Sequence, residues 1–542
     1  MIKAFEKYSN IFLFSIIIFI GLIIYKDYGI SIDEKINRYN GLVNLKYIFE
    51  FFSVSYVHEG LFQNVTQLNS YGDKYYGAAL EIFNVFFIEI LLNKSEINEI
   101  YYLRHFINHS IFVISLCFFY LINNEIFKNK YLSIFGVLLL YTTPRIFAHS
   151  FYNGKDLAFL SFFIIMIYFA IKCLKNLNVK NIFYFSFFFA LAANLRIVAI
   201  YIPFLLILFI FLDSFIRKKK SNFTWLNAFL IIFLSFLLLF ISFPFLWENP
   251  VNGLLEILKL FSKFERWDLK VFYLGEFYKG KFLPWHYLFV SIFITTPLAI
   301  IFMVIGGLLL NFIRLSKRIA LIDNQNLMND FWKGNKEKLI YFILASICIP
   351  VLSIFFLDSV LYNGWRHFYF IYPLLIIHSL FFAEVYFMKF YRSKIKNLIP
   401  LLCFFILFLN IFALYKYHPY QNVFFNNLFV NKANKLFEKD YWGLVNYENL
   451  NKILKLENEK VHIGVASFTD LDLSKKLFKK ELRDKLIIVG QSYEGADYII
   501  NNFLYEVDIE YDDKYKIPDN FKKVFEIKRG KILISEVYKK VR

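Results

Sequence analysis

The stretch IFLFSIIIFIGLIIYKDYGISIDE, residues 11–34, joins a long apolar run to two adjacent carboxylates, Asp33 and Glu34. The run follows a basic start, MIKAFEKYSN, and is long enough to span a bilayer, but it lacks the small-residue cleavage site of a signal peptide. We therefore predict an uncleaved first membrane helix, with the acidic pair a few residues beyond one membrane surface.

The composition of the whole chain predicts many such helices. The chain has 542 residues, of which 58% are hydrophobic and 21% aromatic, and its mean hydropathy is +0.48. A soluble enzyme could not bury that much apolar side chain, whereas repeated apolar segments of roughly 20 residues fit a polytopic α-helical membrane protein. About eleven transmembrane helices are predicted, near residues 9–26, 105–122, 131–149, 156–173, 181–195, 197–213, 225–247, 286–312, 339–357, 366–387 and 398–415.

The basic residues define a topology. The net charge of +18 could indicate a nucleic-acid partner, but Lys and Arg fall mostly between the apolar runs, so no nucleic-acid partner is expected. Lys3 and Lys7 place the N-terminus in the cytoplasm. The same side then receives the basic segments 172–180, 217–220, 314–338 and 389–396. The C-terminus is predicted outside, and the Lys-, Ile-, Asn- and Phe-rich composition is typical of an AT-rich bacterial genome, which favours a bacterial inner membrane.

One segment needs a separate interpretation. Residues 75–93, YYGAALEIFNVFFIEILLN, are apolar enough to enter the bilayer, yet a full span here would invert every later helix. We interpret them as a short or interfacial helix of the first outer loop. The outer face then carries residues 27–104, 150–155, 248–285, 358–365 and the chain after about residue 416.

The sequence predicts three regions. Residues 1–415 form the transmembrane part, with the first outer loop at 27–104; residues 416–450 are a polar and aromatic connector; and residues 451–542 form a small soluble α/β domain on the outer face. Short strands are predicted at 461–468, 485–490 and 496–500, with a hairpin over 525–538 that turns at Arg529 and Gly530.

Candidate functional residues gather in the predicted outer segments. Asp33 and Glu34 could accept a proton from a hydroxyl or amine, although exposed loop acids usually have no such role. The turn YTTPRIFAHSFYNGKD, residues 141–156, adds Pro144, Arg145, His149, Lys155 and Asp156 at the same boundary. Asp156 begins the next span, where a first-turn acid favoured by the helix dipole is an equal alternative.

Two arginines lie at unusual depths. Arg196 lies between two spans with almost no loop around it, where an unpaired cation is costly. Arg366 lies at the outer end of a span, with snorkelling or an ion pair with Asp358 as alternatives. Carboxylates and guanidinium groups together favour a site where a lipid-borne phosphate meets a polar acceptor.

No metal site is predicted. The outer-face histidines, His58, His149 and His286, lack ligand spacing, and so do the cysteines, Cys117, Cys173, Cys348 and Cys403, which also suggest no disulfide. Three tryptophans, Trp247, Trp267 and Trp285, could anchor the protein at the interface or stack on a sugar or prenyl chain, and anchoring is the favoured interpretation.

Several motifs, in order along the chain, resemble GT-C glycosyltransferases of the glycosyltransferase 39 group, which includes protein O-mannosyltransferases and the bacterial aminoarabinose transferase. The similar segments are SIDE (31–34), DKYYGAAL (73–80), TPRIFAHSFYNGKDLAF (143–159), ALAANLRIVA (190–199), FLPWHYLFVSIFITTP (282–297), WRHFYFIYP (365–373) and, within 417–443, YHPYQNVFFNNLF and FEKDYWG. The resemblance covers roughly residues 10–445. The sequence departs from the group at YYGAAL, which lacks the Pro-rich start of several relatives, and at Arg196, where many relatives carry Lys.

The resemblance implies a polyprenyl-phosphate-sugar donor and an inverting transfer at the outer face, to a protein, lipid or glycan acceptor. Asp33 would be the general base, and Glu34 would orient the acceptor or support Asp33. Asp156 would bind the donor sugar or shape the site. The phosphate would be bound by Arg196 and Arg366, and less strongly by Arg145 and Lys155. No cofactor is required, although some relatives in the wider superfamily use a divalent ion.

Two other functions remain alternatives. A transporter or flippase of lipid-linked sugars predicts inverted repeats or paired half-helices, which the sequence does not show. A scaffold that presents the C-terminal domain needs no shared role for Asp33, Asp156 and Arg196. A transferase, in contrast, requires these three side chains to converge on one outer cavity.

Overall fold

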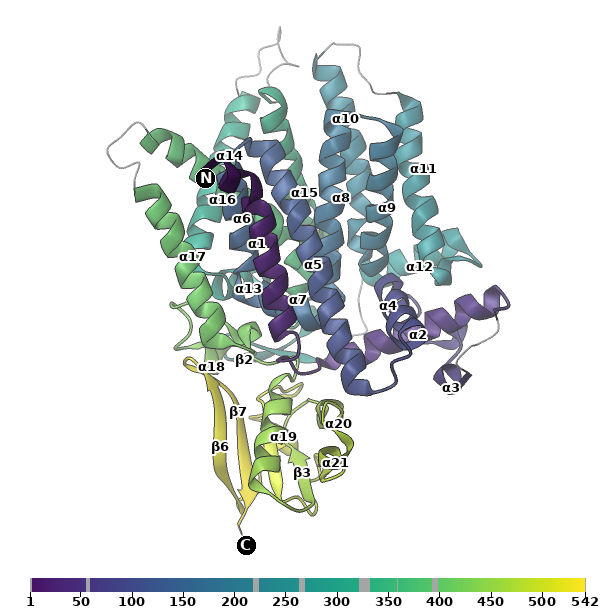
Figure 1. The fold of residues 1–542 in the computed structure, drawn as a ribbon, viewed down its shortest axis with the longest axis vertical. Helices are drawn as coiled ribbons and strands as arrows, with labels where there is room; N and C mark the ends of the chain where they lie inside the picture. The colour runs from purple at the N-terminus through teal and green to yellow at the C-terminus, as the bar shows by residue number, and fades with distance from the viewer. Residues whose placement is uncertain are drawn as a thin grey trace.

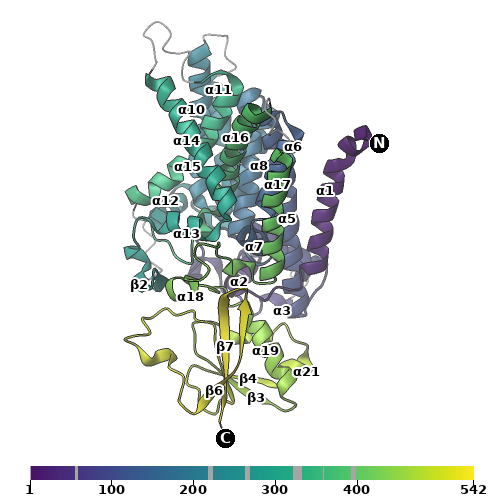
Figure 2. The same cartoon turned by 90° about the vertical axis from the view of Figure 1, so that its left-hand side faces the viewer.

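Long helices form a bundle, and a small domain built on a sheet lies at one end of it (Figure 1). This computed structural model describes residues 2–54, 59–217, 224–262, 269–320, 332–357, 359–391 and 398–541. The N-terminus of the first helix lies toward the opposite end of the bundle from the small domain (Figures 1 and 2).

Within these ranges, eight helices are long and apolar enough to cross a membrane. They are α5 (Ile97–Phe127), α8 (Asp156–Lys175), α10 (Tyr201–Arg217) with the 3₁₀ turn η3 (Ile197–Ile200), α11 (Trp225–Ser242), α14 (Leu298–Ala320), α15 (Gly334–Leu357), α16 (Tyr372–Tyr391) with η6 (Arg366–Ile371), and α17 (Leu398–Tyr417). Two predicted spans are shorter apolar helices, within α1 (Ile2–Ile24) and as α9 (Val179–Leu195). The predicted polytopic helical fold is thus confirmed, but the described residues hold eight such helices, or nine if a bent pair counts as one span, instead of about eleven.

Two predicted spans are broken, and both breaks have a local cause. The span predicted at 131–149 is a pair, α6 (Lys130–Tyr141) and α7 (Pro144–Tyr152), bent by 66°. Proline has no N–H to continue a helical ladder, and the Thr142 and Thr143 hydroxyls donate to the carbonyls of Leu138 and Leu139. The span predicted at 286–312 is α13 (Tyr287–Thr295) followed by α14, with Pro297 between them.

The first loop lies across the end of the bundle. Helix α2 (Ile32–Phe51) runs across that end, beside α4 (Ala79–Asn84) (Figure 1). Helix α4 continues as a π-helix, η2 (Val85–Leu91), so 75–93 forms a short helix and no membrane span, as predicted. The two helices pack closely, since a Cβ at Gly41 would lie 2.6 Å from the Glu81 carbonyl oxygen. The remaining turns of this loop are α3 (Glu59–Phe62) and η1 (Leu68–Ser70).

The C-terminal domain has a five-stranded mixed sheet in the order β4-β3-β5-β7-β6. The strands are β3 (Val461–Val465), β4 (Leu486–Gly490), β5 (Tyr498–Asn501), β6 (Phe521–Arg529) and β7 (Ile532–Lys540), and β3 is parallel to both β4 and β5. All the predicted strands are present, and the predicted hairpin turns at Gly530. The domain's helices are α19 (Val445–Leu456), α20 (Leu471–Lys475), α21 (Lys480–Arg483) and η9 (Asp513–Tyr515).

Shorter elements lie toward the end of the bundle that carries the C-terminal domain (Figures 1 and 2). They are η4 (Pro244–Leu246), α12 (Pro250–Ser262), the hairpin of β1 (Lys270–Tyr273) and β2 (Glu276–Lys279), η5 (Gly280–Phe282), η8 (Gln421–Val423) and α18 (Ala433–Leu436). The segments predicted to share the outer face therefore meet at one end of the molecule.

Candidate functional site

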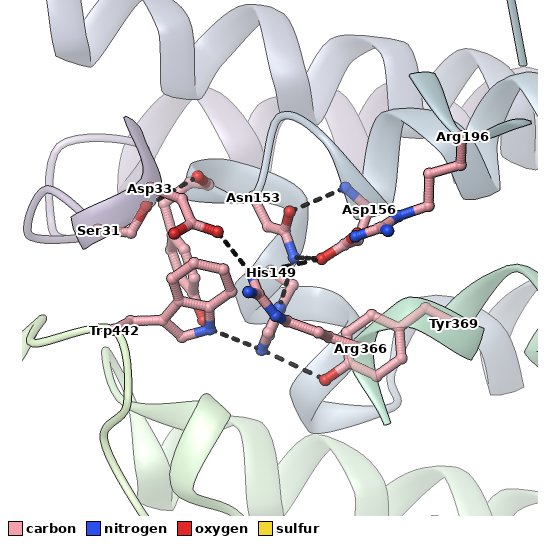
Figure 3. A network of polar contacts seen from close by, with 10 residues as sticks. Ser31, Asp33, His149, Asn153, Asp156, Arg196, Arg366, Tyr369 and Trp442 are labelled. Carbon is pink, nitrogen blue, oxygen red and sulfur yellow. Dashed lines mark hydrogen bonds and ion pairs between the residues drawn. The ribbon is translucent and has the colours of Figure 1, made fainter. Parts of the chain in front are cut away.

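Four of the predicted site residues converge at this end of the bundle (Figure 3). Asp33 lies in the first turn of α2, Asp156 is the first residue of α8, Arg196 lies between α9 and η3, and Arg366 begins η6. The chain thus brings together residues up to 333 positions apart.

The four side chains form one network of ion pairs. Arg366 donates through Nη1 to Asp33 Oδ2 at 2.5 Å, and the same nitrogen lies 3.8 Å from Asp156 Oδ2. Arg196 donates through Nε to Asp156 Oδ1 at 2.6 Å and also through a second guanidinium nitrogen. The Asp156 side chain is 1% exposed, whereas that of Asp33 is 34% exposed. Asp33 is therefore the acid of this cluster that an incoming molecule can reach.

Asp156 is fixed by Asn153, which the sequence reasoning missed. Asn153 Oδ1 accepts from the Asp156 backbone N–H at 2.9 Å, and its Nδ2 donates to Asp156 Oδ2 at 3.0 Å. The same amide lies 3.1 Å from His149 Nδ1, and Tyr369 Oη lies 3.3 Å from His149 Nε2. Asn153 lies three residues before Asp156, a spacing at which an Asn side chain can cap a helix. That spacing was the signal that could have identified Asn153.

Trp442 was also missed. Its indole lies 4.7 Å from the Arg366 guanidinium, in cation–π geometry, and its Nε1 lies 3.4 Å from His149 Nε2. The Tyr362 ring contacts the same guanidinium at 5.1 Å. Both rings lie in cation–π range of the Arg366 guanidinium and help to fix its position.

Glu34 lies outside this cluster. It is 1% exposed, and both of its carboxylate oxygens are occupied: Oε2 accepts from the Ser31 backbone N–H at 2.7 Å, and Oε1 lies 3.0 Å from His105 Nε2. The Ser31 hydroxyl donates to the Tyr152 carbonyl at 3.3 Å. In this geometry Glu34 fixes the turn that presents Asp33, and its predicted role in orienting an acceptor stays a prediction.

The two weaker phosphate candidates differ in position. The buried Arg145 donates to the Phe424 carbonyl at 3.2 Å and lies over the Phe425 ring at 4.9 Å, so it faces the connector. Lys155 lies 3.5 Å from the centre of the Tyr76 ring. The pKa of Lys155 is lowered to about 7, chiefly by burial and next by Arg196, against Asp156 and Asp33, which act to raise it. Lys155 thus belongs to the charged cluster, and Arg145 lies behind it.

The remaining candidates are the histidines, cysteines and tryptophans considered as metal ligands or interfacial anchors. Among the described residues, no group of three or more His, Cys, Asp or Glu side chains could hold a metal ion, and the four cysteines are unbonded. The Tyr273 hydroxyl lies 2.7 Å from His286 Nδ1, Trp285 is 71% exposed, and the Trp247 indole donates to the Phe240 carbonyl. The candidates His58, Trp267 and Asp358 lie outside the described residues.

One comparison, with protein-family models, agrees with the motifs. Residues 106–241 match the family model of dolichyl-phosphate-mannose-protein mannosyltransferase, which confirms the resemblance for that part of the chain. The matched segment contains Asp156 and Arg196. Among solved structures, ArnT from Cupriavidus metallidurans bound to undecaprenyl phosphate is similar, with a TM-score of 0.44, 10% identity and coverage of 98% of each chain. No curated protein matches the sequence at a significant level.

Proposed function

We propose that this chain, whose residues 106–241 match the family model of dolichyl-phosphate-mannose-protein mannosyltransferase, transfers a hexosyl or pentosyl group from a polyprenyl-phosphate donor to an acceptor, with inversion and with Asp33 as the base. The acceptor is a hydroxyl or amine of a protein, lipid or glycan at the outer membrane face. The chain is an integral protein of a bacterial inner membrane, with its N-terminus in the cytoplasm.

The observation that carries this proposal is the convergence of Asp33, Asp156, Arg196 and Arg366. The acceptor oxygen or nitrogen would form a bond to the anomeric carbon while the bond from that carbon to the phosphate oxygen breaks. The acceptor proton would pass to Asp33, and the polyprenyl phosphate would leave as an anion without needing a proton. Two carboxylates and two guanidinium groups supply a base and an anion site without a metal or cofactor.

The ion pair between Arg366 and Asp33 suggests how Asp33 becomes available as the base. Arg366 is bonded to Asp33 at 2.5 Å, and a guanidinium can instead bind two oxygens of a phosphate group in a bidentate pair. When the donor phosphate binds Arg366, Asp33 loses that partner and its Oδ2 is free to take the acceptor proton. Lys155, beside the same cluster, adds positive charge for the phosphate in its protonated form.

The charged cluster also distinguishes this proposal from a scaffold. A scaffold needs no buried acid held by two arginines, whereas a transferase needs its base and its anion site next to each other. Asp156 is buried within the cluster and would shape the donor-sugar site from the start of α8.

The test is sugar release from a panel of polyprenyl-phosphate sugars, comparing the purified wild type with Asp33→Asn. Loss of a positioned base is expected to lower turnover on the order of 10²–10⁴-fold, while donor binding is retained. Asp470→Asn changes a partly exposed acid of the C-terminal domain that pairs with Lys35; it is the matched control and should keep full turnover. Equal turnover in the wild type and Asp33→Asn would exclude Asp33 as the base, and an unchanged reaction after chelation is expected for a metal-independent enzyme.

A further inference from the structure

The carboxyl group of Glu438 has no role in the site described above, yet it is held beside it. Glu438 follows α18, on the same segment as Trp442, and its neighbour Phe437 bridges to Tyr273 of the β1–β2 hairpin. The Phe272 backbone N–H donates to Glu438 Oε1 at 3.2 Å. This bond fixes the carboxyl group against the hairpin.

The second oxygen of this group is left without a partner. Oε2 of Glu438 is buried, and it has no hydrogen bond within the part of the chain that the structure describes. An unsatisfied buried polar atom costs about 1–3 kcal/mol, so such an atom in a folded protein calls for an explanation. A ligand that is absent from the free protein would supply the missing partner.

The groups around Glu438 indicate what that ligand is. Arg366 of η6 and Tyr287 of α13 face it. Burial raises the pKa of Glu438 to about 8, although the Phe272 N–H and Arg366 both act to lower it. At neutral pH the group is therefore mostly protonated. Because Oε1 accepts from the backbone, the proton is on Oε2, and the free position is a hydrogen-bond donor.

We propose that Glu438 binds the donor phosphate, by donating a hydrogen bond from Oε2 to a phosphate oxygen held by Arg366. The proposal rests on the function proposed above and adds a ligand-positioning residue to it. A neutral acid suits this position because Asp33 and Asp156 already place two negative charges near the phosphate. A third ionised carboxylate would repel the anion, whereas a protonated one adds a donor without charge.

The test uses undecaprenyl phosphate as the probe and measures its dissociation constant at pH 7 and pH 9. With a group of pKa about 8, the binding-competent protonated fraction falls from about 0.9 to about 0.1, which weakens binding about tenfold. Glu438→Gln keeps an N–H donor at the free position and does not titrate. Lys155 and the phosphate titrate equally in both proteins, so the wild type should lose about tenfold more affinity than Glu438→Gln over this range.

Three further measurements separate the outcomes. Glu438→Leu, with folding checked by thermal unfolding, should bind weakly at both pH values, and the exposed-site control Glu248→Gln should behave as the wild type. Inorganic phosphate, tested in parallel, shows whether the phosphoryl group alone suffices or the lipid is needed. Identical pH dependence in the wild type and Glu438→Gln would overturn this inference and leave the proposed transferase intact. Failure of the wild type to bind undecaprenyl phosphate at either pH would overturn both.

Discussion

Asp33 and Asp156 share the guanidinium of Arg366, but their surroundings differ. Asp156 is 1% exposed and also receives two bonds from Arg196 and one from Asn153. Asp33 is one-third exposed and is bonded through one oxygen to Arg366. A buried acid with several donors holds a structure together, whereas an accessible acid with one exchangeable partner can take up a proton. The different burial of the two aspartates is the reason for the two roles that we propose for them.

This difference predicts unequal stability effects. Asp156→Asn should lower the free energy of unfolding by about 3 kcal/mol, because it removes the charge that compensates Arg196 and part of Arg366. Asp33→Asn should cost less than about 1 kcal/mol, since solvent already screens this pair. Thermal unfolding of both variants in one detergent measures the difference. A larger loss for Asp33→Asn would contradict these roles.

At the scale of the element, the first turn of α2 positions Asp33. Glu34 closes the first turn onto the Ser31 backbone, and His105 of α5 ties that turn to the bundle. The turn is thus held by a local bond and by a long-range one. Glu34 is bonded to Ser31 and His105, whereas Asp33, the residue before it in the chain, is bonded to Arg366.

Removing the Glu34 contacts with Ser31 and His105 should therefore lower both protein stability and the reaction rate. Glu34→Ala is expected to cost about 1–3 kcal/mol, from the lost cap and the unpaired His105, and to lower kcat more than it raises KM. Glu34→Gln keeps an acceptor for Ser31 and should restore most of both quantities. Thermal unfolding and steady-state kinetics provide the readouts, and a Glu34→Ala enzyme with wild-type kcat would contradict this positioning role.

A second element-scale contact joins the first loop to the end of α9. A Cβ at Gly77 would lie 1.9 Å from the Asn194 carbonyl oxygen, and the Asn194 side chain accepts from the Ala79 N–H at 2.9 Å. Gly77→Ala must push this loop away from Arg196, two residues beyond Asn194. We expect a loss of about 1–3 kcal/mol and weaker donor binding. Gly60→Ala, where a Cβ meets nothing within 4 Å, should leave melting temperature and donor affinity unchanged.

At the scale of the molecule, the C-terminal domain lies directly over the site end of the bundle (Figures 1 and 2). Arg529 of β6 bonds Glu448 at 2.8 Å, and the Asn502 amide donates to the Asp440 carbonyl at 3.2 Å. Asp440 is two residues from Trp442, so the sheet and the arginine cluster are joined through one short segment. The domain and the cluster must therefore face the same compartment.

The predicted topology can be tested on this basis. Ser492→Cys in the exposed β4–β5 loop should react with a membrane-impermeant thiol reagent in intact cells whose outer membrane has been removed. Lys180→Cys, exposed at the start of α9 at the other end of the bundle, should react only after lysis. The reverse pattern would invert the orientation inferred from the basic loops.

The sequence by itself determined the class of fold and the segments that hold the site. Hydrophobic runs of bilayer length, basic linkers and alternating strands are local signals, because each reports what its own residues bury. The breaks in two predicted spans follow from Pro144 and Pro297, which are local signals. Only the tertiary structure shows that Glu34 is bonded to Ser31 and His105, that Asn153 and Trp442 contact Asp156 and Arg366, and that the Phe272 N–H donates to Glu438. These depend on which side chains meet across hundreds of residues, and no local pattern encodes such contacts. Asp33 could be named from its position beyond the first helix, but only the fold shows that Arg366 is bonded to it.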